Sequence, residues 1–568
     1  MHKQLLITIN RIASCFLMVF LLSACGGSND EMATPETGTE SLLQVGINAL
    51  GGVEALRGDT LINLTTEGVT LEPHQDGDEL DALEDITSKY SFNLTSMLSG
   101  EKLHIEYRTD FMYPFPYNGA LTMAINGKEG SVYGIDGFQS RYFGLTLPRP
   151  MYSRRLEALS KTYLMSNPYM LMSRIIEQSS IDAEPVDGSY EITLAAGIPP
   201  VRVELDLDTG LPMRASALER DYLFGDVEYQ VEFGDWKSIE GGGTYPQRVD
   251  HSLDGFTLRA EDVSEVSFGD QKVDPFTFLI SSKRNTYLNI ENPNIIVEGY
   301  DAEEGRRGLE ASQWSMRMLA LGFSQDLPVD AVVITKDNTS RNRKVKVPGN
   351  VYMLEGDTEL MAYTSIILDT AEGIYVVEPG LHQYRSEVAI DAIKEKFPGK
   401  PLLGIIVTHH HMDHMGGLRT YAAETGKVII AENGADFVNT VLSSNHSSFA
   451  DALDGHEGDI EVISVADSMT LGEGEDAFEL LTYPTAHTDD LLMVYFPATK
   501  ALTIGDIFNG EMSDGLRFYN PETKKILVDR AQRLKDFIAD RGLDVETLLT
   551  VHGGAVSANE IDAYLQPE

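Results

Sequence analysis

The sequence predicts two folded parts, a mainly antiparallel β domain over residues 41–295 and an α/β domain over residues 346–568. The first part has many short runs that alternate apolar and polar residues between Gly, Pro or Asp-Gly breaks, which is typical of antiparallel strands. In the second part, buried apolar runs alternate with helical runs, which is typical of an α/β architecture. A chain of 568 residues is also too long for one ordinary core.

The N-terminus, residues 1–25, is expected to be an export signal with a lipid attachment site. Basic residues precede an apolar run at residues 12–22, which is too short to span a bilayer comfortably. The sequence LSAC, ending at Cys25, resembles the bacterial lipoprotein cleavage box, in which the cysteine is lipidated. By the same resemblance, Gly26 rather than aspartate after the cysteine favours the outer over the inner membrane. We therefore expect an exported lipoprotein on the periplasmic side of the outer membrane, and an ordinary signal peptide is the alternative.

The composition limits the partners and the metal ligands of the protein. The polar, Gly/Pro/Thr-rich residues 26–40 are expected to form a flexible tether. The chain has 44 Lys and Arg residues against 88 Asp and Glu residues, a net charge of −44, which opposes binding to nucleic acid. Cys15 and Cys25 are the only cysteines, so a metal site in the folded part must use histidine and carboxylate ligands.

Residues 41–295 are expected to form a curved antiparallel β domain with one or two helices. Apolar side chains have helical spacing at 41–57, and a second helical stretch at 154–178 is expected to kink near Pro168. The segment VEFGDWKSIEGGGTYPQRVDHSLDG, residues 231–255, resembles the half-barrel of LolA-like periplasmic lipoprotein carriers. That resemblance implies a cavity for acyl chains, and a scaffold that presents substrate is the other interpretation.

Residues 296–345 are interpreted as a connector with a helix around Trp314, followed by the α/β domain at 346–568. In this domain TSIILDTAEGIYVVEPG predicts two strands joined by a turn, and EVAIDAIKEKF predicts a short amphipathic helix. Further buried strands are predicted by LLGIIVT, KVIIAE, ALTIGDIF and TLLTVHGG. Several of these strands run directly into polar residues, where functional sites of α/β proteins gather.

The segment THHHMDHMGG at residues 408–417 holds four of the 13 histidines of the chain. Helix or strand propensity does not explain this clustering, whereas a bound cation does. In an extended segment residues i and i+2 point the same way, so His409 and His411 can share one ion while His410 faces away.

The chain is then expected to turn into a helix, so that Asp413 and His414 can reach a second ion. Later strands end in three further candidate ligands, His487, Asp506 and His552. These residues in this order resemble the metallo-β-lactamase fold superfamily, over roughly residues 346–568. The resemblance implies an αβ/βα four-layer sandwich that binds two Zn²⁺ ions per chain.

The resemblance also assigns the ligands of each ion. The first metal would be bound by His409, His411 and His487, and the second by Asp413, His414 and His552, with Asp506 bridging both. Diiron members of the superfamily tend to have Glu at the position of His411, so zinc is expected here. Several β-lactamases have Cys or Ser at the position of Asp506. An aspartate at this position resembles instead glyoxalase II-type thioesterases, lactonases and phosphodiesterases.

The function implied by the resemblance is hydrolysis of an ester, thioester or lactone in a small-molecule substrate by a metal-bridging hydroxide. Asp413 is the candidate catalytic residue, because it could orient the hydroxide or pass its proton to the leaving group. The sequence has no GxSxG, P-loop or HExxH motif. β-Lactam or phosphodiester hydrolysis is the alternative within this chemistry. A lipid- or lipoprotein-binding module with a structural metal domain is the alternative of another class.

Other polar residues near the motif are candidates for supporting roles. Four lie beside expected ligands and could hold them in place, namely Thr408, Thr488, Asp489 and Asp490. The remaining histidines of this part are expected to be surface or supporting residues, namely His382, His410, His446 and His456. Residues 436–458 and 508–520 are polar and contain Gly, so they could form the rim that selects the substrate, or plain surface loops.

Overall fold

The structure is a computed structural model that describes residues 41–72, 86–112, 117–135, 149–151, 153–194, 198–269, 332–336, 345–356, 363–380, 382–456, 459–507 and 521–565. The export signal with Cys25, the tether and the helix expected around Trp314 lie outside these residues. Within them, every helix is too short or too polar to cross a membrane. Residues Ser41–Glu568 belong to one compact unit.

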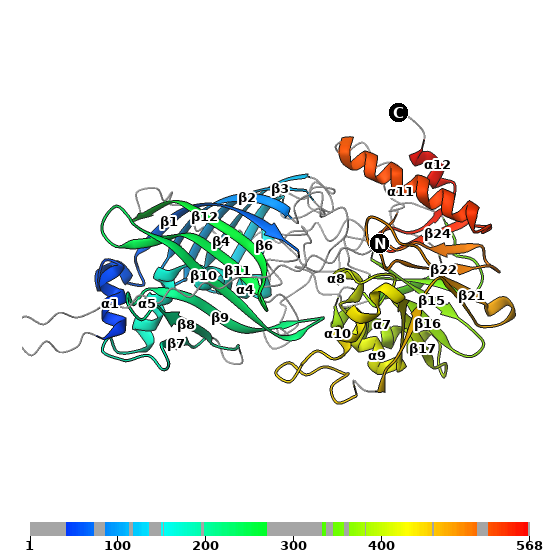
Figure 1. Ribbon diagram of the computed structural model, residues 1–568, viewed down its shortest axis with the longest axis horizontal. Coiled ribbons are helices and arrows are strands. Elements are labelled where there is room, and N and C mark those ends of the chain that lie inside the picture. The colour runs from blue at the N-terminus through cyan, green and yellow to red at the C-terminus, as the bar shows by residue number, and fades with distance from the viewer. Residues whose placement is uncertain are drawn as a thin grey trace, which may run out of the picture. The chain divides into compact units, whose positions relative to one another are not determined.

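The first domain is a large antiparallel sheet, as expected from the alternating runs. Twelve strands follow the order β6-β5-β4-β3-β2-β1-β12-β11-β10-β9-β8-β7, so the first and last long strands pair at its centre (Figure 1). The strands are β1 (Leu61–Leu71), β2 (Ile86–Met97), β3 (Lys102–Phe111), β4 (Tyr117–Asn126), β5 (Glu129–Ile135), β6 (Arg149–Pro150), β7 (Ser189–Ile192), β8 (Val201–Leu205), β9 (Pro212–Asp221), β10 (Gly225–Ser238), β11 (Thr244–Leu253) and β12 (Phe256–Phe268).

Helices pack on the buried face of this sheet. They are α1 (Leu42–Ala49), the short 3₁₀ helix η1 (Val53–Leu56), α4 (Ser153–Met165) and α5 (Pro168–Gln178). The stretch expected to be one kinked helix is two helices, because Asn167 has an extended backbone (φ −121°, ψ 104°). A residue before proline disfavours the helical region. The Asn167 side chain then caps α5 by accepting hydrogen bonds from the backbone N–H groups of Tyr169 (3.0 Å) and Met170 (3.3 Å).

The buried face also carries a charged pair. Arg259 and Glu261 on β12 are 1% and 3% exposed, and they form an ion pair. Tyr90 donates a hydrogen bond to Glu261 (2.8 Å), and the Arg259 guanidinium donates to the hydroxyls of Tyr90 (3.1 Å) and Tyr107 (3.3 Å). Gly68 makes room for this arrangement, since a Cβ there would lie 2.6 Å from the Tyr90 ring. The buried face of the sheet is therefore partly polar.

The second domain has two mixed sheets. The seven-stranded sheet follows the order β13-β14-β15-β16-β17-β18-β19, and the six-stranded sheet the order β20-β21-β22-β23-β24-β25. The strands are β13 (Val332–Thr335), β14 (Val351–Gly356), β15 (Thr364–Asp369), β16 (Ile374–Val377), β17 (Leu402–Ile406), β18 (Lys427–Ala431), β19 (Glu461–Val465), β20 (Ser468–Leu471), β21 (Phe478–Thr482), β22 (Leu492–Phe496), β23 (Ala501–Thr503), β24 (Thr547–Thr550) and β25 (Gly554–Ser557). The edge strand β13 belongs to the segment interpreted as a connector.

Helices cover the outer face of each sheet. They are α7 (Gln383–Lys396), α9 (Leu418–Thr425), α10 (Ala435–Leu442), α11 (Pro521–Asp540) and α12 (Glu560–Tyr564), and Figure 1 shows α7 and α9 side by side. The four-residue helix α8 (Met412–Met415) follows β17 and precedes α9. Successive strand residues alternate between faces. Thus Ile405 packs with the helix-facing core and Ile406 with the core between the sheets. In the other sheet Leu549 belongs to the central core and Leu548 packs with α11 residues. The arrangement is helix–sheet–sheet–helix.

Candidate metal centre

The candidate ligands lie just beyond the ends of four strands in the two sheets. β17 leads into His409 and His411, and α8 then carries Asp413 and His414. The three later candidates follow β21, β23 and β24, in the order His487, Asp506 and His552. All seven are close enough to form two neighbouring groups. The expectation that these strand ends meet is therefore confirmed.

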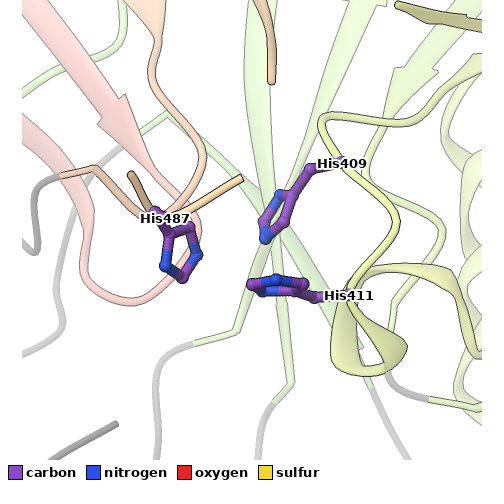
Figure 2. A group of neighbouring side chains, drawn as sticks. All are labelled: His409, His411 and His487. Atoms are coloured by element: carbon purple, nitrogen blue, oxygen red, sulfur yellow. The ribbon is translucent and has the colours of Figure 1, made fainter. Parts of the chain in front are cut away.

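The first group consists of His409, His411 and His487. All three side chains are buried, and one ligand atom of each lies within 4.8 Å of the others. The His411 ring centroid is 4.5 Å from those of both His409 and His487, and Figure 2 shows the three imidazoles converging. Three convergent imidazoles in a buried position have the donor atoms that a borderline cation such as Zn²⁺ prefers.

The second group consists of Asp413, His414, Asp506 and His552. Asp506 accepts from His414 Nε2 (3.1 Å) and lies 3.3 Å from His552 Nε2, while Asp413 lies 3.4 Å from both of these nitrogens. Asp506 Oδ2 is also 3.8 Å from Nε2 of His487 in the first group. Asp506 therefore lies between the two groups, and the bridging role that the resemblance implies stays a prediction.

The electrostatics of the site keep its carboxylates ionised. Burial opposes ionisation of Asp413 and Asp506, but the charge of His414 outweighs it and holds both pKa values well below their usual range. Burial likewise opposes protonation of His552, yet Asp506 and Asp413 raise its pKa to about 9. Burial and the neighbouring histidines instead hold the pKa of His409 well below its usual range, so its imidazole stays neutral.

A buried glutamate that the sequence analysis did not single out connects the two groups. Glu378 accepts hydrogen bonds from His414 Nδ1 (3.0 Å) and from the hydroxyl of Thr408. The same Thr408 hydroxyl lies 3.0 Å from His409 Nδ1. Glu378 has a φ of +75°, an unfavourable region for a non-glycine residue, so the fold holds it in this position at a cost. Its place directly after the apolar strand IYVV was the available signal.

Two further side chains reach the site from elsewhere in the domain. Tyr363 donates a hydrogen bond to the backbone carbonyl of Asp413 (2.5 Å). Arg530 on α11 lies 3.2 Å from His487 Nδ1 and donates to the Asp506 carbonyl (3.3 Å). Both residues are distant in sequence from the motif, and neither belongs to a recognisable pattern.

The expected supporting residues divide into two sets. Thr408 contacts a candidate ligand, whereas Thr488 and Asp490 bind His410, whose Nδ1 lies 3.1 Å from Asp490 Oδ1. Asp489 is exposed, and its backbone carbonyl accepts a hydrogen bond from Asn433.

The other histidines lie outside both groups. His410 does face away from the first group, as the alternation predicted. His382 caps α7, and His446 is buried beside Asp451. The side chain of His456 is 68% exposed. Residues 508–520 lie outside the described part of the chain.

The hydrogen bonding of the His409 ring indicates whether a metal ion fits the site. Within the described part of the chain, His409 Nε2 is buried and has no hydrogen-bond partner, while Nδ1 of the same ring faces Thr408. A buried polar atom left in this way is costly unless something binds it. Because the Thr408 hydroxyl donates to Glu378, it accepts from Nδ1, and the ring carries its proton on that side. The free lone pair then faces the other ligands, which fits a metal ion.

Comparison with known proteins agrees with this geometry. Residues 357–552 match the family model described as the Metallo-beta-lactamase superfamily. Hydroxyacylglutathione hydrolase of Shewanella pealeana is 40% identical over 76 residues, which are 13% of this chain and 26% of that protein. Metallo-beta-lactamase type 2 of Bacillus cereus is 23% identical over 161 residues, 28% of this chain and 56% of that protein. The fold expected of the C-terminal half is confirmed.

Two further similarities are more limited. Linear primary-alkylsulfatase of Pseudomonas sp is 35% identical over 68 residues, which are 11% of this chain and 10% of that protein. The solved structure of a metallo-beta-lactamase from Pontibacter korlensis has a TM-score of 0.29 and 20% identity, and the match covers 41% of this chain and 97% of that one. The chain spans only 26% and 10% of the hydroxyacylglutathione hydrolase and the alkylsulfatase.

Proposed function

Because the C-terminal half of this chain is a metallo-beta-lactamase superfamily domain, we propose that the protein is a di-zinc hydrolase of an ester, thioester or lactone. The observation that carries the proposal is the pair of buried ligand groups joined by Asp506. His409, His411 and His487 would hold one ion, and Asp413, His414 and His552 the other. Zinc bound there would supply Lewis acidity and lower the pKa of a coordinated water.

The chain's own residues supply the remaining requirements of hydrolysis. The ionised Asp413 carboxylate can accept a proton from the attacking water and return it to the leaving group. The hydrogen bond from Tyr363 to its backbone holds this residue in place. Glu378 orients His414 directly and His409 through Thr408, which keeps the ligating nitrogens directed at the site.

The acyl substrate class is favoured by two observations. The aspartate at position 506, where several β-lactamases have Cys or Ser, supports a thioesterase- or lactonase-like site. The similarity to a protein named hydroxyacylglutathione hydrolase points to the same class. β-Lactam and phosphodiester hydrolysis are the alternatives within the same chemistry, and the alkylsulfatase similarity adds an alkyl sulfate to the substrates worth testing.

The experiment uses residues 26–568, purified and supplied with zinc. A lactone, an acyl thioester, a chromogenic cephalosporin, a phosphodiester and an alkyl sulfate are assayed with and without a chelator. Chelator-sensitive turnover that is lost in His409→Ala and kept in His456→Ala would support the proposal, since His456 is an exposed histidine outside both groups. Two bound zinc ions without turnover of any substrate would contradict it and favour the lipid-binding alternative.

We also propose that the protein is a lipoprotein attached through Cys25 on the periplasmic side of the outer membrane. The LSAC box and the glycine after it support this proposal. Fractionation of cells that express the full chain tests it. The protein should move from the membrane fraction to the soluble fraction in Cys25→Ser, whereas Cys15→Ser should leave its distribution unchanged.

A further inference from the structure

The tip of the β9–β10 hairpin is a preformed turn. Its residues are Tyr222, Leu223 and Phe224, between the ends of the two strands. The buried Asp221 carboxylate accepts hydrogen bonds from the backbone N–H groups of Leu223 (2.7 Å) and Phe224 (3.0 Å). Gly225 completes the turn with a φ of +73°. The tip is thus held in one shape before it meets any ligand.

This tip is anchored to the domain that carries the metal centre. The backbone N–H of Asp226 donates to the Asn445 carbonyl (2.7 Å), and its carboxylate accepts from Ser447 Oγ (2.9 Å). Ser444 Oγ donates to the Leu223 carbonyl (2.9 Å). A Cβ at position 225 would collide with the Asn445 carbonyl, so the backbones approach as closely as glycine allows. These contacts bind the hairpin to the expected rim segment 436–458.

A second set of contacts anchors the hairpin at the start of α7. Arg220 donates a hydrogen bond to the hydroxyl of Tyr384 (2.7 Å) and another to the side-chain carbonyl of Gln383. The Tyr222 ring lies 5.8 Å from the His382 ring. The start of α7 follows Glu378 by only a few residues, so this side of the hairpin adjoins the segment that orients the metal ligands.

Aromatic rings lead from the hairpin tip to the metal centre. The Phe224 ring centroid is 5.8 Å from that of Phe437 on α10, which is 5.1 Å from His410. His410 is in turn 5.1 Å from the candidate ligand His411. Asp221, Leu223 and Gly225 are buried, whereas Tyr222, Phe224 and Phe437 are partly buried. Phe224 is therefore linked to the ligand His411 through Phe437 and His410, and Tyr222 lies against His382 on the other side of the tip.

We propose that this hairpin tip forms a wall of the substrate site, where Tyr222 and Phe224 contact an apolar acyl or alkyl group of the substrate. The inference rests on the proposed hydrolase. Partly buried aromatic side chains at a junction between domains are typical of the linings of pockets for apolar ligands. The polar contacts of Arg220 and Asp226 keep the wall rigid, so the cost of ordering it is not incurred when the substrate binds.

If the hairpin tip contacts an acyl group, the affinity of the protein for a carboxylate should rise with the number of carbons in the carboxylate. Straight-chain carboxylates with two to eight carbons, the acyl products of ester hydrolysis, serve as the probes. The zinc-loaded full chain is titrated with each in a calorimeter. Transfer of a methylene group from water into an apolar site corresponds to about a twofold to fourfold gain in affinity, depending on how fully it is buried. We expect this gain in affinity per methylene group in the wild type. It should be lost in Phe224→Ala and Tyr222→Ala and kept in Phe224→Leu.

Matched variants separate the wall from other effects. Tyr133→Ala removes a 46% exposed aromatic side chain on β5 and should leave the gain per methylene group unchanged. Zinc content and melting temperature are measured for each variant, so that loss of the metal or of the fold is recognised. The inference is overturned if affinity in the wild type does not depend on chain length, or if folded Phe224→Ala keeps the wild-type gain per methylene group. Failure of the proposed hydrolase would appear separately, as absence of turnover in the substrate panel.

Discussion

Replacing Glu378 with glutamine should weaken zinc binding by about 10- to 100-fold. Glu378 holds His414 through a direct hydrogen bond and His409 through the hydroxyl of Thr408, so both ligand groups depend on its charge. A hydrogen bond to a charged group contributes about 1.5–3 kcal/mol, and a neutral one contributes about half of that. Two weakened bonds therefore cost about 1.5–3 kcal/mol, which corresponds to the stated loss in affinity.

The assay for this variant is competition between the full chain and a chelator of known zinc affinity. The direct bond is made to the second group, so the ion bound by His414 should be lost first. Glu372→Gln is the matched control, because Glu372 is exposed in the turn that precedes β16. If Glu378→Gln binds two zinc ions as tightly as the control does, the inference that one carboxylate orients both groups is refuted.

Three further predictions concern charges. Burial opposes ionisation of Glu261, but the ion pair with Arg259 outweighs it and lowers the pKa of Glu261 to about 2 from an ordinary 4.5. The ionised Glu261 therefore stabilises the fold fully above pH 4.5, and this stabilisation is lost as the pH falls through 2. Glu261→Gln should remove about 3 kcal/mol near pH 7 and flatten the acid limb of urea unfolding curves; equal acid sensitivity in both proteins would contradict this. Because His552 has a pKa of about 9, it is protonated at pH 7 without metal, and zinc binding should release a proton from it. The calorimetric enthalpy should then vary with the ionisation enthalpy of the buffer at pH 7, and a zero slope would exclude such release. Finally, Asp506→Ala should lose one zinc ion or most activity, since its carboxylate contacts both groups; a variant with two ions and full rate would show that Asp506 is not a ligand.

The ligand set could be predicted because its information is local or lies at strand ends. His409 and His411 follow a buried strand with the i, i+2 spacing that directs both side chains to one side, and His410 turns away to Asp490. Asp413 occupies the short helix expected after them. Each of these placements depends on neighbouring residues, which the sequence displays directly.

The parts that escaped prediction depend on contacts between distant segments. Glu378 meets Thr408 and His414 only after two parallel strands pair, and its position after an apolar strand, the one signal in its own segment, does not identify these partners. Arg220 and Gln383 are separated by 163 residues, so the contact of the hairpin with α7 could not be read from either segment. The LolA-like interpretation of the first domain stays a prediction. The buried face of that domain includes the charged pair of Arg259 and Glu261.

The central claim is that the two groups joined by Asp506 form one dinuclear hydrolytic site. The most direct test measures turnover of a cleaved substrate while zinc is added stepwise to the metal-free full chain, with bound zinc counted by mass spectrometry. The account predicts that two zinc ions bind per chain, that the rate rises until the second has bound, and that His411→Ala binds fewer ions and stays inactive. Full turnover of the metal-free chain, or a rate that does not change as zinc binds, would contradict it.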